Sequence, residues 1–188
     1  MSGRLKLITA PTVEPVTAAE VKLSSHISHS VEDSLIAIWI AEARELAEII
    51  LRKSLITQTW ELSFDGFPEM PIDLPRSPVQ SITSVTYYDY LDAATVITST
   101  NYQLDTSASP ARLGLIYGYT WPGVTLRKID SVKIRYVSGY GASAAYVPAS
   151  IRSAIILYCT IKDGNRMGED GDASKKLKNA LASKRIHL

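Results

Sequence analysis

The stretch from Leu55 to Tyr88 decides the fold. It begins with Leu55-Ile-Thr-Gln-Thr-Trp-Glu-Leu-Ser-Phe64 and ends, after a proline-rich segment, with Pro78-Val-Gln-Ser-Ile-Thr-Ser-Val-Thr-Tyr-Tyr88. Apolar and polar residues alternate from Trp60 to Asp65, and this period of two predicts a half-buried β-strand. The segments on either side have helical patterns. We therefore expect a β module inserted into a helical frame, which is typical of a part that is assembled rather than of an enzyme.

The β pattern continues to about residue 137. Ile72 and Leu74 lie among prolines, which cannot donate to a β ladder, so they predict a short edge strand. Further strands are predicted at 81–90, 95–98, 102–104, 112–117 and 131–137. This spacing predicts an antiparallel sheet, a sandwich or an open barrel.

Two helices are predicted before the β module. Thr17 and Glu20 have the spacing of a capping box, so a short helix should begin there and end near Ser25. A long helix is predicted from Val31 to Lys53, where apolar residues line one broad face. Its solvated side should carry an i, i+4 ladder of charged residues, namely Arg44, Glu48 and Arg52.

Helical patterns return after the β module. Pro148 suits the first position of a helix that ends near Asp163 and Gly164. A final helix is predicted from Ala173 to Leu188, with Leu177 and Leu181 on a weak apolar face. The expected fold class is α+β, with a helical frame and an inserted antiparallel β lobe. Its expected parts are an N-terminal helical part (1–54), the β lobe (55–140), a helix that completes the frame (141–165), and a linker with a basic helix (166–188).

Composition excludes several classes of protein. The chain has 188 residues, of which 46% are hydrophobic and 21% charged, as in a soluble globular protein. No apolar run has the length that a bilayer requires, and the N-terminus lacks a secretory signal, so we expect an intracellular product without a membrane partner. The net charge of +1 gives no global signature of nucleic-acid binding. The single cysteine, Cys159, excludes an internal disulfide and is interpreted as a buried thiol.

One glycine motif could indicate a dinucleotide site. Gly139-Tyr-Gly141-Ala-Ser-Ala144 matches the form G-x-G-x-x-A. A dinucleotide site also needs a parallel βαβ unit whose helix begins at the glycines, whereas the helix here should begin later, at Pro148. We interpret the motif as a turn between a strand and a helix.

Two weaker patterns could indicate metal sites. Asp163, Asn165 and Gly168 imitate the start of a calcium loop, but Met167 stands where an oxygen ligand belongs. His26 and His29 have no neighbour that completes a zinc set. We therefore predict no cofactor, no metal ion and no catalytic residue.

The C-terminal segment suggests a docking surface. It carries five basic residues and no acidic residue after Asp172. A solvated helix and a helix that docks on an acidic partner or faces nucleic-acid phosphates are both compatible with this pattern. The candidate contact residues for such a partner or for DNA are Lys175, Lys176, Lys178, Lys184 and Arg185; if the partner is a portal protein, as the family resemblance given below implies, the same residues are its candidate contacts. Six aromatic residues of the β lobe are interpreted as packing or, less favoured, as subunit contacts: Tyr87, Tyr88, Tyr90, Tyr117, Tyr119 and Trp121.

Several phrases resemble those of a known family. They are Leu7-Ile-Thr-Ala-Pro11, Leu55-Ile-Thr-Gln-Thr-Trp-Glu-Leu62, Leu74-Pro-Arg-Ser-Pro-Val-Gln-Ser-Ile-Thr-Ser-Val85, Ser138-Gly-Tyr-Gly141 and Val147-Pro-Ala-Ser-Ile-Arg-Ser-Ala-Ile155. From about Leu5 to Asn165 the chain resembles the head-tail connector, or adaptor, proteins of tailed bacteriophages and gene transfer agents. The region after Asn165 departs from that pattern.

This resemblance implies a structural virion protein with no catalytic role. Many copies, expected as a dodecamer, would form a ring below the portal protein around the DNA channel. The implied partners are the portal, the next tail-side connector (a stopper or tail terminator) and DNA, the last by weak non-specific contact. The implied location is the head-tail interface of the virion, assembled in the host cytoplasm. A tail or baseplate β-lobe module that recognises glycans or another tail protein is the alternative, and a hydrolase has only generic residues in its favour.

Overall fold

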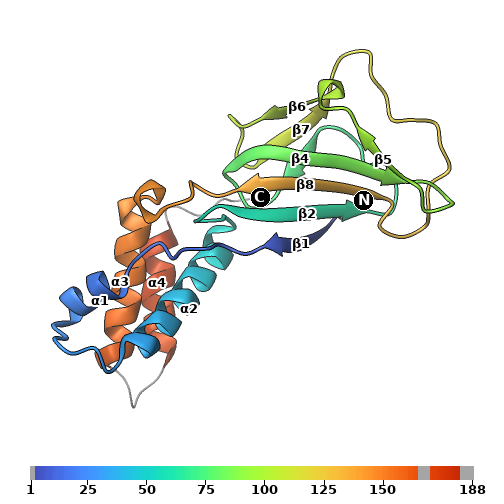
Figure 1. Cartoon of the computed structure of the whole chain (residues 1–188). Coiled ribbons are helices and arrows are strands. Elements are labelled where there is room, and N and C mark those ends of the chain that lie inside the picture. Colours follow the sequence, from blue (N-terminus) through green and yellow to red (C-terminus); the bar gives the residue numbers. More distant parts are fainter. Residues whose placement is uncertain (1–2, 165–169, 183–188) are drawn as a thin grey trace. The chain divides into compact units, whose positions relative to one another are not determined.

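The chain forms two compact units, each with its own core. The computed structural model describes residues 3–164 and 170–182 (Figure 1). A β unit is built from residues 1–10 and 57–139, and a helical unit from residues 11–56 and 140–188. This architecture confirms the predicted α+β fold class.

The described part of the β unit contains two antiparallel sheets (Figure 1). The strands of the five-stranded sheet are, in order, β1 (Arg4–Thr9), β2 (Gln58–Phe64), β8 (Val132–Ser138), β4 (Val79–Tyr88) and β5 (Ala94–Ile97). Those of the three-stranded sheet are β3 (Ile72–Leu74), β7 (Ala111–Leu115) and β6 (Tyr102–Asp105), and a 3₁₀ turn, η1 (Ser99–Asn101), precedes β6. Every predicted strand is found, and β3 lies at an edge as its prolines predicted.

Side chains from both sheets form one apolar core. Leu62 and Ile134, on adjacent central strands of the larger sheet, pack in the same cluster as Leu74 and Leu113 of the smaller sheet. Tyr136 is fully buried in this cluster, and its hydroxyl donates to the carbonyl oxygen of Pro75 at 2.9 Å. Burial raises the pKa of this phenol because the apolar core disfavours the anion.

The N-terminal residues differ from the expectation of a helical part at 1–54. Arg4–Thr9 form β1, which pairs with β2 in antiparallel register, for example Leu5 with Leu62. Leu5 packs against the β core, so burial of this side chain and the backbone bonds to β2 favour the strand. The first residues therefore belong to the β unit, although they lie far from it in the sequence.

Within residues 11–56, 140–164 and 170–182 the helical unit contains four helices. They are α1 (Ala18–Ser25), α2 (Asp33–Leu51), α3 (Ala149–Gly164) and α4 (Asp170–Leu181), with a 3₁₀ turn, η2 (Ala144–Tyr146), before α3. The predicted capping box is confirmed: the backbone N–H of Glu20 donates to Thr17 Oγ1 at 3.2 Å, and the Thr17 N–H donates to Glu20 Oε2 at 2.7 Å. None of the helices in the described residues is long and apolar enough to cross a membrane.

The prediction that Arg44 and Glu48 lie on the solvated side of α2 is wrong. Both are buried, with exposed fractions of 8% and 6%. Arg44 Nε donates to Glu14 Oε2 at 2.9 Å, and Glu48 Oε1 accepts from the backbone N–H of Leu55 at 2.9 Å. The segments before and after α2 thus fold over this side of the helix and satisfy both charges.

Three predicted core positions of the helical unit are confirmed. Cys159 is fully buried in the core, and burial raises the pKa of its thiol to about 12, so the thiol is inert near neutral pH. Leu177 and Leu181 of α4 are also buried and belong to the same core. The part of the predicted C-terminal helix beyond residue 182 lies outside the described residues.

Candidate interaction surfaces

The glycine motif is a turn, as predicted. Strand β8 is antiparallel to both of its neighbours, and α3 begins only at Ala149. The side chain of Tyr146 occupies the space beside Gly141: a Cβ added there would lie 2.3 Å from Cδ2 of the tyrosine ring. This space is therefore closed to a pyrophosphate, which in a dinucleotide site must approach the glycine backbone.

Replacing Gly141 by alanine is expected to destabilise the helical unit. The new Cβ would meet the ring and Cβ of Tyr146, and these atoms are too close to the backbone to move without a shift of η2. Overpacking of this kind costs about 1–3 kcal/mol. Gly164→Ala is the matched control because nothing lies within 4 Å of its added Cβ. Chemical denaturation of both variants measures the difference, and equal stabilities would contradict the prediction.

The histidines do not share a helix face. His26 is the C-cap of α1, in the left-handed conformation with φ of 56°, and His29 lies beyond the helix. Among the described residues no group of three or more His, Cys, Asp or Glu side chains is placed to hold a metal ion. Most of the calcium-like segment, from 165 to 169, lies outside the described residues.

Three of the five predicted basic contact residues lie together on α4. Lys175, Lys176 and Lys178 are exposed, and Lys176 Nζ lies 2.9 Å from a carboxylate oxygen of Asp172, one turn earlier. Leu177, between them, is fully buried in the helical core. The helix is therefore anchored by its apolar side and presents its lysines to solvent. Lys184 and Arg185 lie outside the described residues.

The outer face of α2 carries exposed apolar side chains and is a candidate interaction surface that the sequence reasoning missed. Leu35, Ile38 and Ile49 have exposed fractions of 40%, 63% and 62%. Exposed apolar side chains grouped on one helix face are typical of a protein contact surface. The sequence does contain a signal for this surface, because these three apolar residues lie outside the stripe of α2 that is buried in the core.

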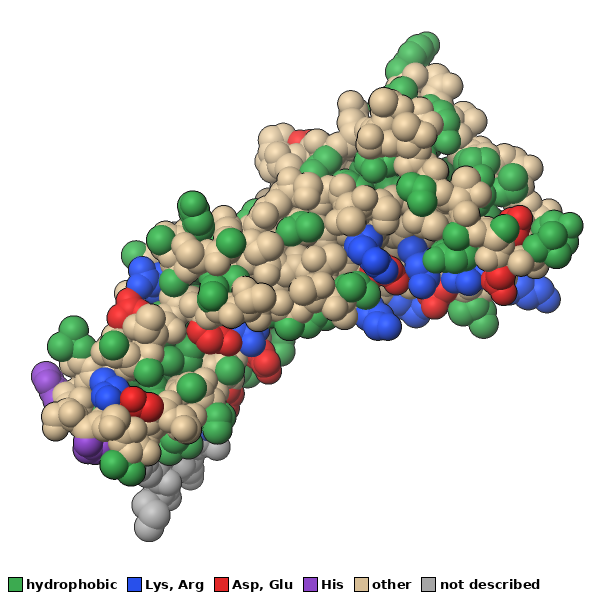
Figure 2. Space-filling view, viewed as in Figure 1, with side chains coloured by type: hydrophobic (Ala, Val, Ile, Leu, Met, Phe, Trp, Pro, Cys, Tyr) green, Lys and Arg blue, Asp and Glu red, His purple; other side chains and the backbone are tan. Residues whose placement is uncertain are grey.

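The face of the larger sheet that points away from the core is charged (Figure 2). Arg4 of β1 donates to Asp65 at 2.9 Å and to Asp130 at 2.7 Å. On the adjacent strands Glu61 accepts from Arg135 at 2.6 Å and lies 3.3 Å from Lys133. Positive and negative groups thus compensate each other on this face, and it does not form a basic stripe.

The Arg4–Asp65 pair makes stability depend on pH. The hydrogen bond from Arg4 holds the pKa of Asp65 at about 2, below its ordinary value of 3.8. A carboxyl with a lowered folded-state pKa stabilises the fold above its unfolded pKa, and this stabilisation is lost as pH falls from about 4 to about 2. Asp65→Asn should flatten this part of the stability profile, measured by urea denaturation at stepped pH. In the matched control, Asp73→Asn, the free energy of unfolding should depend on pH as it does in the unchanged chain. The prediction is contradicted if Asp65→Asn also shows the pH dependence of the unchanged chain.

The six aromatic residues of the β lobe divide into two groups. Tyr87, Tyr119 and Trp121 pack against the β core, and the guanidinium of Arg127 lies 3.8 Å from the ring centroid of Tyr88. The favoured interpretation as packing is correct for these. Tyr90 is 67% exposed and Tyr117 is fully exposed, so these two are available to a partner.

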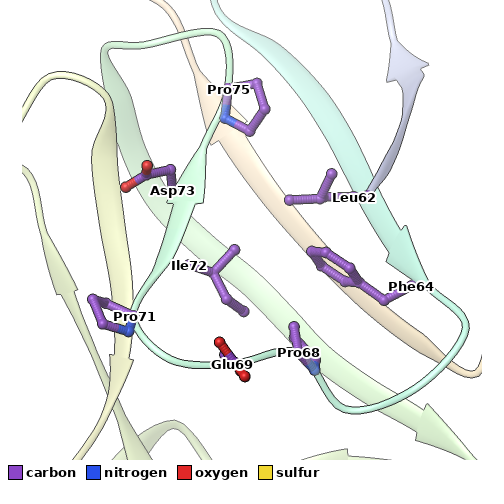
Figure 3. Close-up of a pocket in the computed structure, with 9 residues that line it drawn as sticks. Leu62, Phe64, Pro68, Glu69, Pro71, Ile72, Asp73 and Pro75 are labelled. Carbon is purple, nitrogen blue, oxygen red and sulfur yellow. The ribbon is translucent and has the colours of Figure 1, made fainter. Parts of the chain in front are cut away.

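Two adjoining hollows lie on the β unit, and they share Pro68 and Glu69. Each has a volume of about 330 Å³. In the first, Leu62 and Phe64 of β2 lie on one side and Ile72 of β3 lies on the other (Figure 3). The aromatic side chains that line the second are Phe67, Tyr119 and Trp121. Sequence reasoning did not find these hollows because their lining comes from distant segments between residues 3 and 121.

Comparison with known proteins places the fold. No family model and no curated protein matches the sequence. A chain in the neck of an empty gene transfer agent particle, computed with C6 symmetry, aligns with a TM-score of 0.78 at 19% identity, over 98% of this chain and 97% of that one. A chain of the native gene transfer agent virion aligns with a TM-score of 0.77 at 18% identity, over 98% and 96%. A chain in the neck of the native particle, computed with C12 symmetry, aligns with a TM-score of 0.69 at 17% identity, over 98% and 97%.

These alignments cover both units of the chain. At such identities they establish a shared fold, so this chain has the fold of a gene transfer agent neck protein. The sequence phrases indicated a resemblance to head-tail connectors, and the shared fold confirms this resemblance.

Proposed function

We propose that this chain is a structural protein of a virion neck and acts there as a head-tail connector without catalytic activity. It forms a ring below the portal, around the channel through which DNA passes, and it joins the virion during assembly in the host cytoplasm. The observation that carries the proposal is the alignment of both units, over 98% of the chain, with neck proteins of gene transfer agent particles.

A ring needs two different patches on each subunit, which meet head to tail. The helical unit offers the exposed apolar face of α2, formed by Leu35, Ile38 and Ile49. The β unit offers exposed apolar side chains at its loops, among them Leu91 and Ile129, with exposed fractions of 71% and 69%. The solved necks were computed with C6 and C12 symmetry, which supports a dodecamer for this chain.

The ring has three kinds of partner. The exposed lysines of α4 contact the portal, and the opposite side of the ring contacts the next tail-side connector. DNA makes weak, non-specific contact in the channel, because strong phosphate binding would hinder its passage. The net charge of +1 and the compensated charges on the outer sheet face suit such weak contact.

Electron microscopy of the purified chain with and without portal particles tests this function. The expected result is a closed ring seated on the portal. A chain that stays monomeric and leaves portal particles bare would overturn the proposal.

Reversing the charge of Lys175 and Lys178 is expected to weaken portal attachment by about thirtyfold, because each of the two lost ion pairs costs roughly 1 kcal/mol. Both side chains are exposed, so the helix should stay folded. Truncation after Asp172 is a poorer test because it also removes Leu177 and Leu181 from the core. Lys128→Glu, an exposed site on the β unit, is the control for net charge. Sedimentation with portal particles measures binding, and equal attachment of both variants would exclude this role for the lysines.

The alternative is a tail or baseplate module that recognises glycans, and the exposure of Tyr90 and Tyr117 favours it, since tyrosine rings offer amphipathic contact area. Saturable glycan binding that is lost in Tyr117→Ala, by a chain that forms no ring, would favour this function over the first.

A further inference from the structure

The two hollows beside Pro68 and Glu69 adjoin, and together they are called the groove; buried apolar side chains lie at its base and two acidic side chains at its rim. Leu62, Phe64 and Ile72 line the first hollow, and the second is lined in part by Phe67 and Trp121. Glu69 borders both hollows and Asp73 borders the first; both side chains are exposed. Neither carboxylate has an ion pair within the part of the chain that the structure describes. No basic residue lines either hollow. The groove therefore suits a peptide that combines apolar side chains with positive charge.

The chain itself contains such a peptide. Residues 183–188, which follow the last described residue, read Ser-Lys-Arg-Ile-His-Leu. Bound in an extended conformation, the segment would place Ile186 and Leu188 on the same side, about 7 Å apart. Lys184 and Arg185 would lie next to these apolar residues. The segment has the charge opposite to that of the groove, and it has one apolar side chain for each hollow.

We propose that residues 183–188 of one copy dock into the groove beside Pro68 and Glu69 of a second copy. Ile186 and Leu188 enter the two hollows, Lys184, on the same side of the extended segment, pairs with the acidic rim formed by Glu69 and Asp73, and Arg185 adds positive charge beside it. Six residues in an extended conformation span about 20 Å. This inference rests on the ring of the proposed function, and it assigns the tail to the contact between copies.

The acidic rim gives the proposal a test by charge exchange. A labelled peptide of residues 183–188 should bind saturably to the full chain, and Glu69→Lys with Asp73→Lys should weaken this binding by about tenfold. A peptide with Lys184→Glu and Arg185→Glu should recover binding to the reversed groove. Glu45→Lys is the matched control, because Glu45 is exposed on α2 in the other unit. Equal affinity of the peptide for all proteins would overturn the groove as its site.

Engineered cysteines test whether the contact joins two copies. Cys159 is buried with a raised thiol pKa, so it stays out of the reaction. A chain with Asp73→Cys, mixed with a differently tagged chain with His187→Cys, should form a mixed disulfide under mild oxidation. Pairing Glu45→Cys with His187→Cys controls for random encounters. A yield no higher than in this control, or a disulfide within single monomers of the double variant Asp73→Cys/His187→Cys, would overturn docking on a second copy.

The outcome can be separated from that of the proposed function. Rings that assemble on the portal without the mixed disulfide would exclude the tail contact and leave the connector function standing. A chain that forms no ring on the portal, yet forms the mixed disulfide, would keep the contact between copies and remove the function.

Discussion

Replacing Glu48 by alanine is expected to lower the free energy of unfolding by about 3 kcal/mol. Removing one partner of a buried ion pair costs about 3–5 kcal/mol, because the other charge stays behind without compensation. Arg44 keeps its bond to Glu14, which places the effect at the lower end of that range. The backbone N–H of Leu55 also loses its acceptor, the Oε1 atom of Glu48. Urea denaturation followed by the helical circular dichroism signal measures the loss.

Glu45→Ala is the control for this variant. Glu45 belongs to the same helix and also lies 3.4 Å from Arg44, but its side chain is 67% exposed. Exposed ion pairs contribute at most about 1 kcal/mol, so this variant should stay close to the unchanged chain. Similar losses in both variants would show that burial of the Arg44–Glu48 pair does not determine its contribution.

Truncating Leu177 to alanine is expected to cost about 2–5 kcal/mol. Leu177 is fully buried between α4 and the rest of the helical core, and replacing a buried leucine by alanine loses apolar contact and leaves a cavity. The loss should appear as release of α4, measured by faster amide hydrogen exchange over Asp172–Leu181 than elsewhere in the helical unit.

Lys178→Ala provides the comparison at the next position, where the side chain is exposed and the expected change is within about 0.5 kcal/mol. If Leu177→Ala exchanges no faster than Lys178→Ala, α4 is held to the unit by other contacts.

Local sequence patterns predicted most of the fold. The strands could be predicted because Trp60, Leu62 and Phe64 alternate with polar residues, and the helices because Thr17 and Pro148 mark their starts. Strand β1 could not be predicted because it buries little apolar surface. Leu5 is half-buried and the other residues of the strand are exposed, so the strand conformation depends on pairing with β2. Arg44 and Glu48 were placed in solvent because helical spacing says nothing about Glu14 and Leu55, which fold over them.

The candidate surfaces were less predictable than the fold. A cluster of lysines in one segment can be read from the sequence, so Lys175, Lys176 and Lys178 were found. The groove beside Glu69 could not be found in this way, because Leu62, Ile72 and Trp121 meet there only after both sheets have formed. Local periodicity contains no information about such distant encounters.

The strand order has a consequence for synthesis on the ribosome. Strand β8 lies between β2 and β4, yet it is translated after every other strand of the β unit. Until residue 138 has emerged, β2 and β4 each lack a neighbour, and unpaired strand edges favour association between nascent chains. The core of the helical unit must likewise wait for α3 and α4. Neither unit can be completed early, so both fold near the end of translation, and a chain that stops before β8 exposes two open strand edges.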